Sequence, residues 1–190
     1  MTDGKTLRVL AISGSLRKAS YNTALLHAAQ ELAPADMTIE IFDLAPLPLY
    51  NEDVKAAGFP PVVQLLRDKI KAADALLFAT PEYNYSMSGV LKNAIDWASR
   101  PPDQPFDEKP VAIMGASPSA LGTGRAQYHL RQSCIYLNMH LLNKPEVMIA
   151  AANTKFDAQG KLTDEATRGF VQTLLINLAA WTRRLERSAA

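Results

Sequence analysis

The sequence contains one cysteine, Cys134, among 190 residues, so no disulfide can form within the chain. Cys134 belongs to no C-x-x-C pair and falls in an apolar helical pattern, where we expect a buried, unreactive thiol. The histidines His27, His129 and His140 do not have the spacing of metal ligands, and neither H-E-x-x-H nor G-x-S-x-G occurs. These absences argue against a disulfide scaffold, a metal enzyme and a serine hydrolase.

The sequence also lacks an excess of charge of one sign, because 20 lysines and arginines balance 19 aspartates and glutamates for a net charge of +1. Such a chain has no field that would draw it to nucleic acid or to an anionic membrane. No apolar run approaches the length of a membrane span, and residues 1–5 lead into a strand without the apolar stretch of a signal peptide. We therefore expect a cytoplasmic protein that binds neither nucleic acid nor membrane.

Hydrophobic residues make up 48% of the chain and charged residues 21%, which is the composition of an ordinary globular protein. No repeat, low-complexity tract or domain-sized linker interrupts the sequence, so we expect one domain over residues 1–190. Apolar residues that run continuously or alternate predict five strands, at residues 7–12, 37–42, 75–79, 111–115 and 147–149. The alternation over residues 37–42 is typical of a strand near the edge of a sheet.

Helical spacing of apolar residues separates these strands, at residues 22–32, 62–70, 91–98 and 125–138. A last helix is predicted to follow Thr163, which has the character of an N-cap. The proline-rich residues 45–61 show no period and are predicted to form a long loop. Buried strands joined by helices indicate an α/β fold with a parallel sheet covered on both faces, whose ligands bind outside the carboxyl ends of the strands.

The loop after the first strand is rich in groups that bind phosphate. It offers hydroxyl, amide and guanidinium groups at Ser13, Ser15, Arg17, Ser20, Asn22 and Thr23. This loop leads into the N-terminus of a helix, where backbone N–H groups and the helix dipole favour an anion. We predict a site for a terminal phosphate monoester; the alternative is a serine-rich turn whose hydroxyls only cap the helix. No G-x-x-x-x-G-K-[ST] is present, and G-x-G-x-x-G is missing from this loop, which argues against ATP and dinucleotides.

Two further loops leave the third and fourth predicted strands at the same edge of the sheet. In residues 80–89, Tyr83 and Tyr85 offer flat apolar faces, and Asn84 can hydrogen-bond the edge of a planar heterocycle. Residues 115–125 are mostly small, so their backbone can approach a flat ring closely. Taken singly, the tyrosines could pack against a second subunit, and the small residues could form a flexible loop. Convergence of the three loops favours a ligand site.

Together these segments resemble the NAD(P)H-dependent FMN reductase family, the flavodoxin-like quinone and chromate reductases. The matching stretches are Gly-Ser-Leu-Arg at 14–17, Pro-Glu-Tyr-Asn at 81–84, Gly-x-Leu-Lys-Asn-Ala-Ile-Asp-Trp at 89–97 and Gly-Ala-Ser at 115–117. The resemblance implies a three-layer α/β sandwich around a five-stranded parallel sheet of order 2-1-3-4-5. It also implies FMN as the cofactor and NAD(P)H as the co-substrate.

The resemblance assigns roles to particular residues. The FMN phosphate is expected to be held by Ser15, Arg17, Ser20, Asn22 and Thr23, and Ser13 is also expected to bind the cofactor. The isoalloxazine is expected to be bordered by Pro81, Glu82, Tyr83 and Asn84, with Ser117 near its other side. Family members work as homodimers or homotetramers, and a polar network between subunits, or pairs within one chain, is expected of Tyr85, Arg125, Tyr128 and Glu146.

In such an enzyme the flavin carries the chemistry, so no side chain needs to act as nucleophile or general base. NAD(P)H gives a hydride to FMN and departs, and a small acceptor such as a quinone, chromate, an azo compound or free flavin then takes the electrons. The main alternative is a flavodoxin-like electron carrier that docks to a redox partner. Carriers usually show strong charge of one sign, and a net charge of +1 argues against that alternative. A nucleotide or sugar-phosphate sensor without a redox role is a third possibility.

Overall fold

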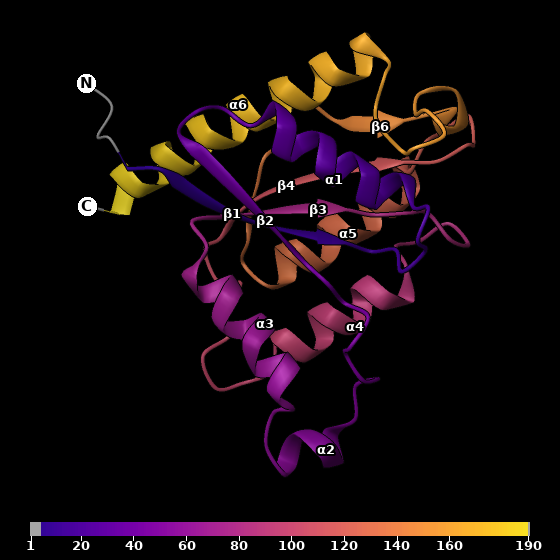
Figure 1. The fold of residues 1–190 in the computed structure, drawn as a ribbon. Coiled ribbons are helices and arrows are strands. Elements are labelled where there is room, and N and C mark those ends of the chain that lie inside the picture. Colours follow the sequence, from indigo (N-terminus) through magenta and orange to yellow (C-terminus); the bar gives the residue numbers. More distant parts are fainter. Residues whose placement is uncertain (1–4, 190) are drawn as a thin grey trace.

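A parallel β-sheet forms the middle layer of the molecule (Figure 1). In the computed structural model, which describes residues 5–189, the strands are β1 (Leu7–Ser13), β2 (Met37–Phe42), β3 (Ala75–Ala79), β4 (Pro110–Ala116), β5 (His140–Leu141) and β6 (Val147–Ile149). Neighbouring strands pair in parallel in the order β2-β1-β3-β4-β5, and β6 also pairs with β4. The predicted strand order is confirmed.

The fifth position of the sheet is filled by two short strands rather than one. β5 pairs with the amino end of β4, where Val111 faces Leu141. β6 pairs with the carboxyl end of β4, where Ala116 faces Ile149. The sequence predicts only β6, because the two residues of β5 are too few to show a hydropathy pattern.

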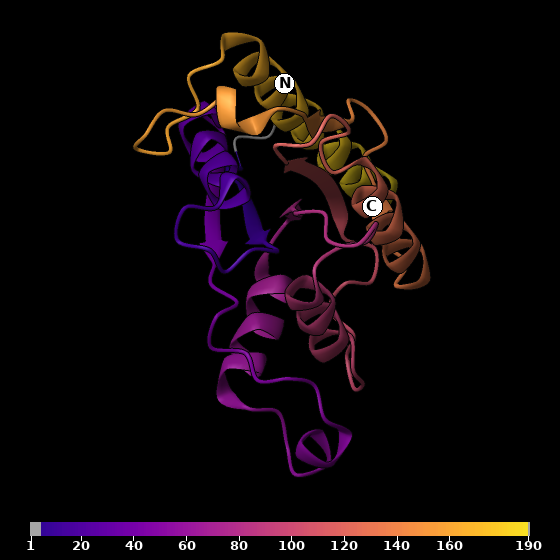
Figure 2. The same ribbon diagram turned by 90° about the vertical axis from the view of Figure 1, so that its right-hand side faces the viewer.

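Helices cover both faces of the sheet (Figures 1 and 2). α1 (Tyr21–Leu32) and α6 (Glu165–Ala189) share one core with Val9 and Ala11 of β1. On the other face, Leu10 and Ile12 share a core with α3 (Pro61–Ala72), α4 (Gly89–Ala98) and α5 (Gly124–Tyr136). A 3₁₀ helix, η1 (Ala152–Thr154), lies between β6 and α6. Burial on both faces explains why β1, β3 and β4 appear as nearly continuous apolar runs, whereas the edge strand β2 alternates. The predicted three-layer sandwich is confirmed.

The predicted loop over residues 45–61 is wrong in one part, because it contains the short helix α2 (Glu52–Ala56). Asn51 caps this helix by accepting the N–H of Asp53 at 2.8 Å. None of its residues is buried, so it leaves no apolar period in the sequence. α2 projects from the body of the molecule (Figures 1 and 2), and the segment before it is anchored where Trp97 Nε1 donates to Pro48 O at 2.9 Å.

The cap of α6 is Asp164 rather than the predicted Thr163. Asp164 Oδ1 accepts the N–H and the hydroxyl of Thr167 at 2.9 and 2.6 Å, and its carbonyl accepts the N–H of Arg168 at 3.0 Å. The Thr163 hydroxyl instead donates to Lys155 O at 3.3 Å. The hydrogen bonds from Thr167 and Lys155 lower the pKa of Asp164 to about 2. Thr163 and Asp164 can both cap a helix, and the backbone conformation at these positions decides which of them does.

The lone cysteine lies inside the sandwich, as the sequence predicts. Cys134 of α5 is fully buried in the core shared by α3, α4 and α5. Burial raises the pKa of its thiol to about 12, which keeps it protonated and unreactive. Across residues 5–189, none of the helices is both long enough and apolar enough to cross a membrane.

Candidate functional site

A small open pocket lies where the loops after β1, β3 and β4 meet, at the carboxyl ends of these strands. Its volume is about 100 Å³. Pockets that enclose a whole small-molecule ligand measure roughly 300–1,000 Å³, so this one suits an end group with the rest of the ligand outside. Eight residues predicted for the site line it: Ser15, Arg17, Ser20, Asn22, Pro81, Glu82, Tyr83 and Ser117. Three further lining residues, Tyr21, Ala116 and Pro118, were not among the predicted site residues.

The loop between β1 and α1 is held in shape by its own serines. Ser20 caps α1, and its hydroxyl accepts the N–H of Thr23 at 3.3 Å. Behind the pocket, the hydroxyls of Ser13 and Thr23 lie 2.9 Å apart and hydrogen-bond to each other. These two residues support the loop without lining the pocket. Ser20, Tyr21 and Asn22 at the start of α1 line the pocket, so the pocket lies at a helix N-terminus, where unpaired backbone N–H groups and the helix dipole favour an anion.

Arg17 brings the one guanidinium among the residues that line this pocket. Its side chain is exposed and donates to the carbonyl of Ala19 at 2.7 Å. Its backbone N–H donates to Ser15 Oγ at 3.4 Å, which holds the two residues together in the loop. A positive group on an exposed loop beside a helix N-terminus suits the binding of a phosphate.

Asn22 joins the first loop to the third. Its side-chain amide donates to Ala116 O at 3.1 Å, and its Oδ1 accepts the N–H of Ala116 at 2.9 Å. The residue is 4% exposed, so this pair of bonds is shielded from water. With its side chain committed to Ala116, Asn22 offers the pocket its backbone N–H in the first turn of α1.

Ser88 joins the first loop to the second. Its buried hydroxyl donates to Gly14 O at 2.6 Å and caps α4 by accepting the N–H of Leu91 at 3.2 Å. A Cβ atom built on Gly14 would lie 2.9 Å from Ser88 Oγ and 3.0 Å from Pro81 Cδ, so glycine is needed for the two loops to approach.

The second loop contains a tight turn from Tyr83 to Ser86. These two residues exchange both backbone hydrogen bonds at 3.0 Å. Asn84 and Tyr85 between them have φ angles of 50° and 67°, as in a type I′ turn. Asparagine tolerates this left-handed conformation, whereas it is strained for tyrosine. Tyr83 lines the pocket and is 51% exposed, and Asn84 lies on the turn beyond the lining.

Glu82 lines the pocket but directs its charge away to α5. Its side chain is 6% exposed, forms an ion pair with Arg125 and accepts the N–H of Ala126 at 3.1 Å. The hydrogen bond between the Arg125 and Glu82 side chains raises the pKa of Arg125. The Arg125 guanidinium lies 3.7 Å from the centre of the Tyr85 ring. Glu82 can therefore border a flat ring with its backbone, while its carboxylate stabilises the start of α5.

The four residues predicted for a subunit network have partners within the chain. Arg125 contacts Glu82 and Tyr85, and the Tyr128 hydroxyl donates to Glu146 Oε1 at 3.0 Å. Tyr85 is 67% exposed and Tyr128 is 55% exposed, so both rings remain on the surface of the protomer.

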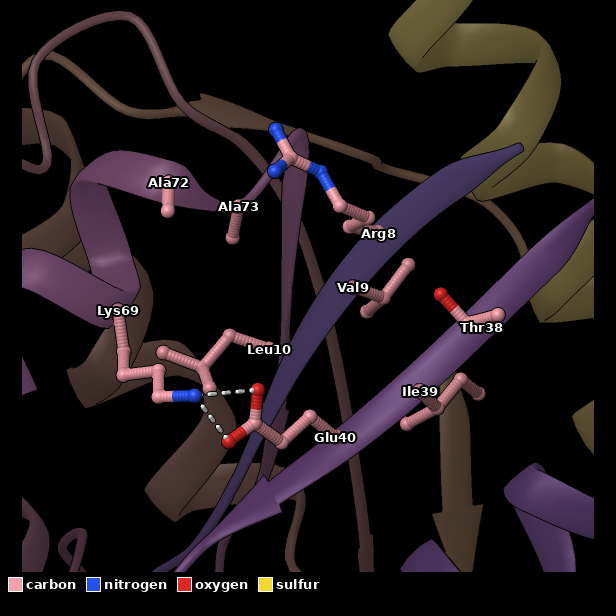
Figure 3. A pocket seen from close by; sticks show the side chains of 9 residues that line it. All are labelled: Arg8, Val9, Leu10, Thr38, Ile39, Glu40, Lys69, Ala72 and Ala73. Atoms are coloured by element: carbon pink, nitrogen blue, oxygen red, sulfur yellow. Dashed lines mark hydrogen bonds and ion pairs between the residues drawn. The ribbon is translucent and has the colours of Figure 1, made fainter. Parts of the chain in front are cut away.

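A larger pocket of about 320 Å³ lies beside the amino-terminal halves of β1 and β2, next to α3 (Figure 3). Lys69 and Glu40, which form an ion pair at 2.8 Å, are among the residues that line it (Figure 3). None of the predicted site residues lines it. Because ligands of parallel α/β sheets bind at the carboxyl ends of the strands, the smaller pocket is the candidate site. Within the described part of the chain, no cluster of three or more histidine, cysteine or acidic side chains could hold a metal ion.

Comparison with known proteins finds relatives whose names agree in describing NAD(P)H-dependent oxidoreductases. An NAD(P)H-dependent FMN reductase of Pseudomonas aeruginosa is 62% identical over 179 residues, which cover 94% of this chain and 97% of that protein. An NADPH:quinone oxidoreductase of Arabidopsis thaliana is 48% identical over 186 residues, which cover 95% and 94% of the two chains. The solved structure of FerB, a flavoenzyme NAD(P)H:(acceptor) oxidoreductase from Paracoccus denitrificans, matches with a TM-score of 0.86 at 36% identity, covering 94% of this chain and 98% of FerB.

The family model of NADPH-dependent FMN reductases matches residues 7–154. This range contains the three loops that form the pocket, including the Gly-Ser-Leu-Arg and Pro-Glu-Tyr-Asn segments. The resemblance drawn from these segments is confirmed, and the chain belongs to the NADPH-dependent FMN reductase family.

Proposed function

We propose that the protein is an FMN-dependent oxidoreductase that passes electrons from NAD(P)H to small acceptors, with the FMN phosphate in the pocket at the N-terminus of α1. The observation that carries this proposal is the set of groups around a phosphate-sized volume. Ser15, Ser20 and Arg17 offer hydroxyl and guanidinium donors beside a helix N-terminus. Glu82 is the one carboxylate among the residues that line this pocket, and its pairing with Arg125 keeps its charge from opposing a phosphate.

The flavin ring belongs outside this pocket, across the second and third loops. Pro81 and Tyr83 come from one side and Ser117 from the other, and Tyr83 keeps half of its surface exposed. Bound FMN supplies the capacity to take a hydride from NAD(P)H and to pass electrons on. The chain's own residues bind the phosphate, orient the ring and leave one face of it open to a second molecule.

The acceptors included in this proposal are quinones, chromate, azo compounds and free flavin. A quinone is favoured because the Arabidopsis relative carries that substrate class in its name. The proposal further includes one FMN-binding domain over residues 1–190, a homodimer or homotetramer, and a cytoplasmic location where NAD(P)H is available. Tyr85 and Tyr128, exposed on the protomer, are the side chains through which a second copy would be contacted.

Arg17→Ala should weaken FMN binding roughly tenfold to hundredfold, because a hydrogen bond to a charged group contributes about 1.5–3 kcal/mol. Fluorescence titration of the FMN-free protein measures the dissociation constant. Riboflavin, which lacks the phosphate, should bind both proteins equally. Lys18→Ala is the matched control, because Lys18 is exposed next to Arg17 and does not line the pocket. An Arg17→Ala protein that holds FMN as tightly as the wild type would show that the phosphate binds elsewhere.

A further inference from the structure

The turn from Tyr83 to Ser86 is strained and yet begins with Tyr83, which lines the candidate site. Tyr85 has a φ of 67°, a conformation that bulky side chains rarely adopt. Such a conformation persists only where surrounding contacts hold it. The turn itself supplies two backbone hydrogen bonds between Tyr83 and Ser86. Hydrogen bonds, an ion pair and a ring contact also reach this segment from α5.

α5 contacts the turn before, within and after its strained residues. Before it, the Glu82 carboxylate pairs with Arg125 and accepts the N–H of Ala126 at 3.1 Å. Within it, the Arg125 guanidinium lies 3.7 Å from the centre of the Tyr85 ring, as in a cation–π contact. After it, His129 Nδ1 lies 3.0 Å from Ser86 Oγ. Arg125 and His129 are one helical turn apart, so one side of α5 holds the whole segment.

The ion pair at the centre of this arrangement is too well shielded to be an incidental surface contact. The Glu82 side chain is 6% exposed and that of Arg125 is 34% exposed. A carboxylate with so little access to water must keep its partners, because losing them leaves a buried charge unpaired. α5 has no side-chain cap at Thr123, so the Glu82 carboxylate also takes that place at the helix N-terminus.

We propose that Arg125, fixed by Glu82, is a positioning residue of the flavin site. It keeps the turn in its left-handed conformation before the ligand arrives, so that Tyr83 and Asn84 meet the ring in a preformed arrangement. Preorganisation of this kind raises affinity by removing an ordering cost at the moment of binding. The inference rests on the proposed function, since it concerns how tightly the ring side of the same site is held.

The test is the affinity of purified variants for FMN and for riboflavin. Arg125→Ala should raise both dissociation constants about tenfold. The turn contacts the flavin ring, and FMN and riboflavin have the same ring. Arg125→Lys should restore part of the affinity, since lysine keeps the pair with Glu82 but cannot stack as a planar group. Glu82→Gln should weaken the binding of both ligands as well. The double variant should be no weaker than Arg125→Ala, because both changes act through one contact.

Glu40→Gln is the matched control, because it removes the exposed ion pair with Lys69 far from the site and should leave both affinities unchanged. Titrations are run well below the unfolding temperature of each variant, so that a loss of stability alone does not change the measured dissociation constants. The proposal is overturned if Arg125→Ala binds both ligands as the wild type does, or if the Glu82 and Arg125 effects add. It is also overturned if the variants lose affinity for the ligands only under conditions in which analytical sedimentation shows that an oligomer dissociates. A wild-type protein that binds no FMN would instead overturn the proposed function.

Discussion

Arg67→Met should lower the free energy of unfolding by about 3–5 kcal/mol, because several hydrogen bonds to a charged donor, each contributing about 1.5–3 kcal/mol, are lost at once. Arg67 belongs to α3 and is only 6% exposed. Its guanidinium lies 4.2 Å from the centre of the Phe59 ring. It donates to four backbone carbonyls, that of Ala98 at the end of α4 and those of Arg100, Pro102 and Asp103 in the segment that follows. Methionine has a similar length and no donors, so these carbonyls would lose their shared partner.

The guanidinium stays charged because the carbonyls replace the water that it loses. Burial lowers the pKa of Arg67, and Asp103 and Asp68 oppose that shift. Urea unfolding at neutral pH measures the difference in stability. Arg8→Met is the control, because the side chain of Arg8 is 62% exposed and its pair with Asp74 is 3.4 Å long, so the expected loss is within about 1 kcal/mol. Equal losses in both variants would show that Arg67 does not hold the segment after α4.

Gly115→Ala should destabilise the protein by about 3 kcal/mol, at the upper end of the range for overpacking a core. A Cβ atom at this position in β4 would lie 2.0 Å from Thr123 Oγ1 and 2.5 Å from Thr80 O. Thr123 is fully buried and the Thr80 atom belongs to the backbone, so neither can move aside cheaply. The end of β4 would have to shift, and the third loop would shift with it.

FMN affinity should therefore fall together with stability in Gly115→Ala, which thermal unfolding and FMN titration measure in parallel. Gly89→Ala is the matched control. A Cβ atom on Gly89 would meet nothing within 4 Å, and alanine in a helix is favoured over glycine by up to about 1 kcal/mol. If Gly115→Ala were as stable as Gly89→Ala, the packing between β4 and Thr123 would be loose enough to admit a methyl group, which would contradict this prediction.

The sheet could be predicted from the sequence because both of its faces are buried. Every residue of β3 is apolar and fully buried, so its run stands out without any alternation. The elements that escaped prediction are those whose stability does not come from an apolar pattern. β5 has two residues, and α2 is held by the Asn51 cap with none of its residues buried. The sequence could not decide whether Thr163 or Asp164 caps α6. The two residues are adjacent, and either side chain can accept a hydrogen bond from a backbone N–H of the first helical turn.

For the site, the sequence predicted which loops meet but not how each side chain is used. Eight predicted residues line one pocket, because the carboxyl ends of neighbouring parallel strands share an edge. Asn22 and Glu82 instead bond to Ala116 and Arg125, which lie 94 and 43 positions away in the chain. Partners at such separations leave no local spacing to detect. The left-handed turn at Tyr85 also escaped, because tyrosine gives no sequence signal for that conformation.

The central claim is that the pocket at the N-terminus of α1 receives the phosphate of FMN, and a crystal structure of the protein grown with excess FMN tests it most directly. We expect the phosphate within hydrogen-bonding distance of Ser15, Ser20 and the first-turn N–H groups of α1, with Arg17 turned from the Ala19 carbonyl toward it. The ring should lie against Tyr83. A phosphate bound at any other place, or a pocket without phosphate in which Arg17 is still bonded to Ala19, would contradict the account.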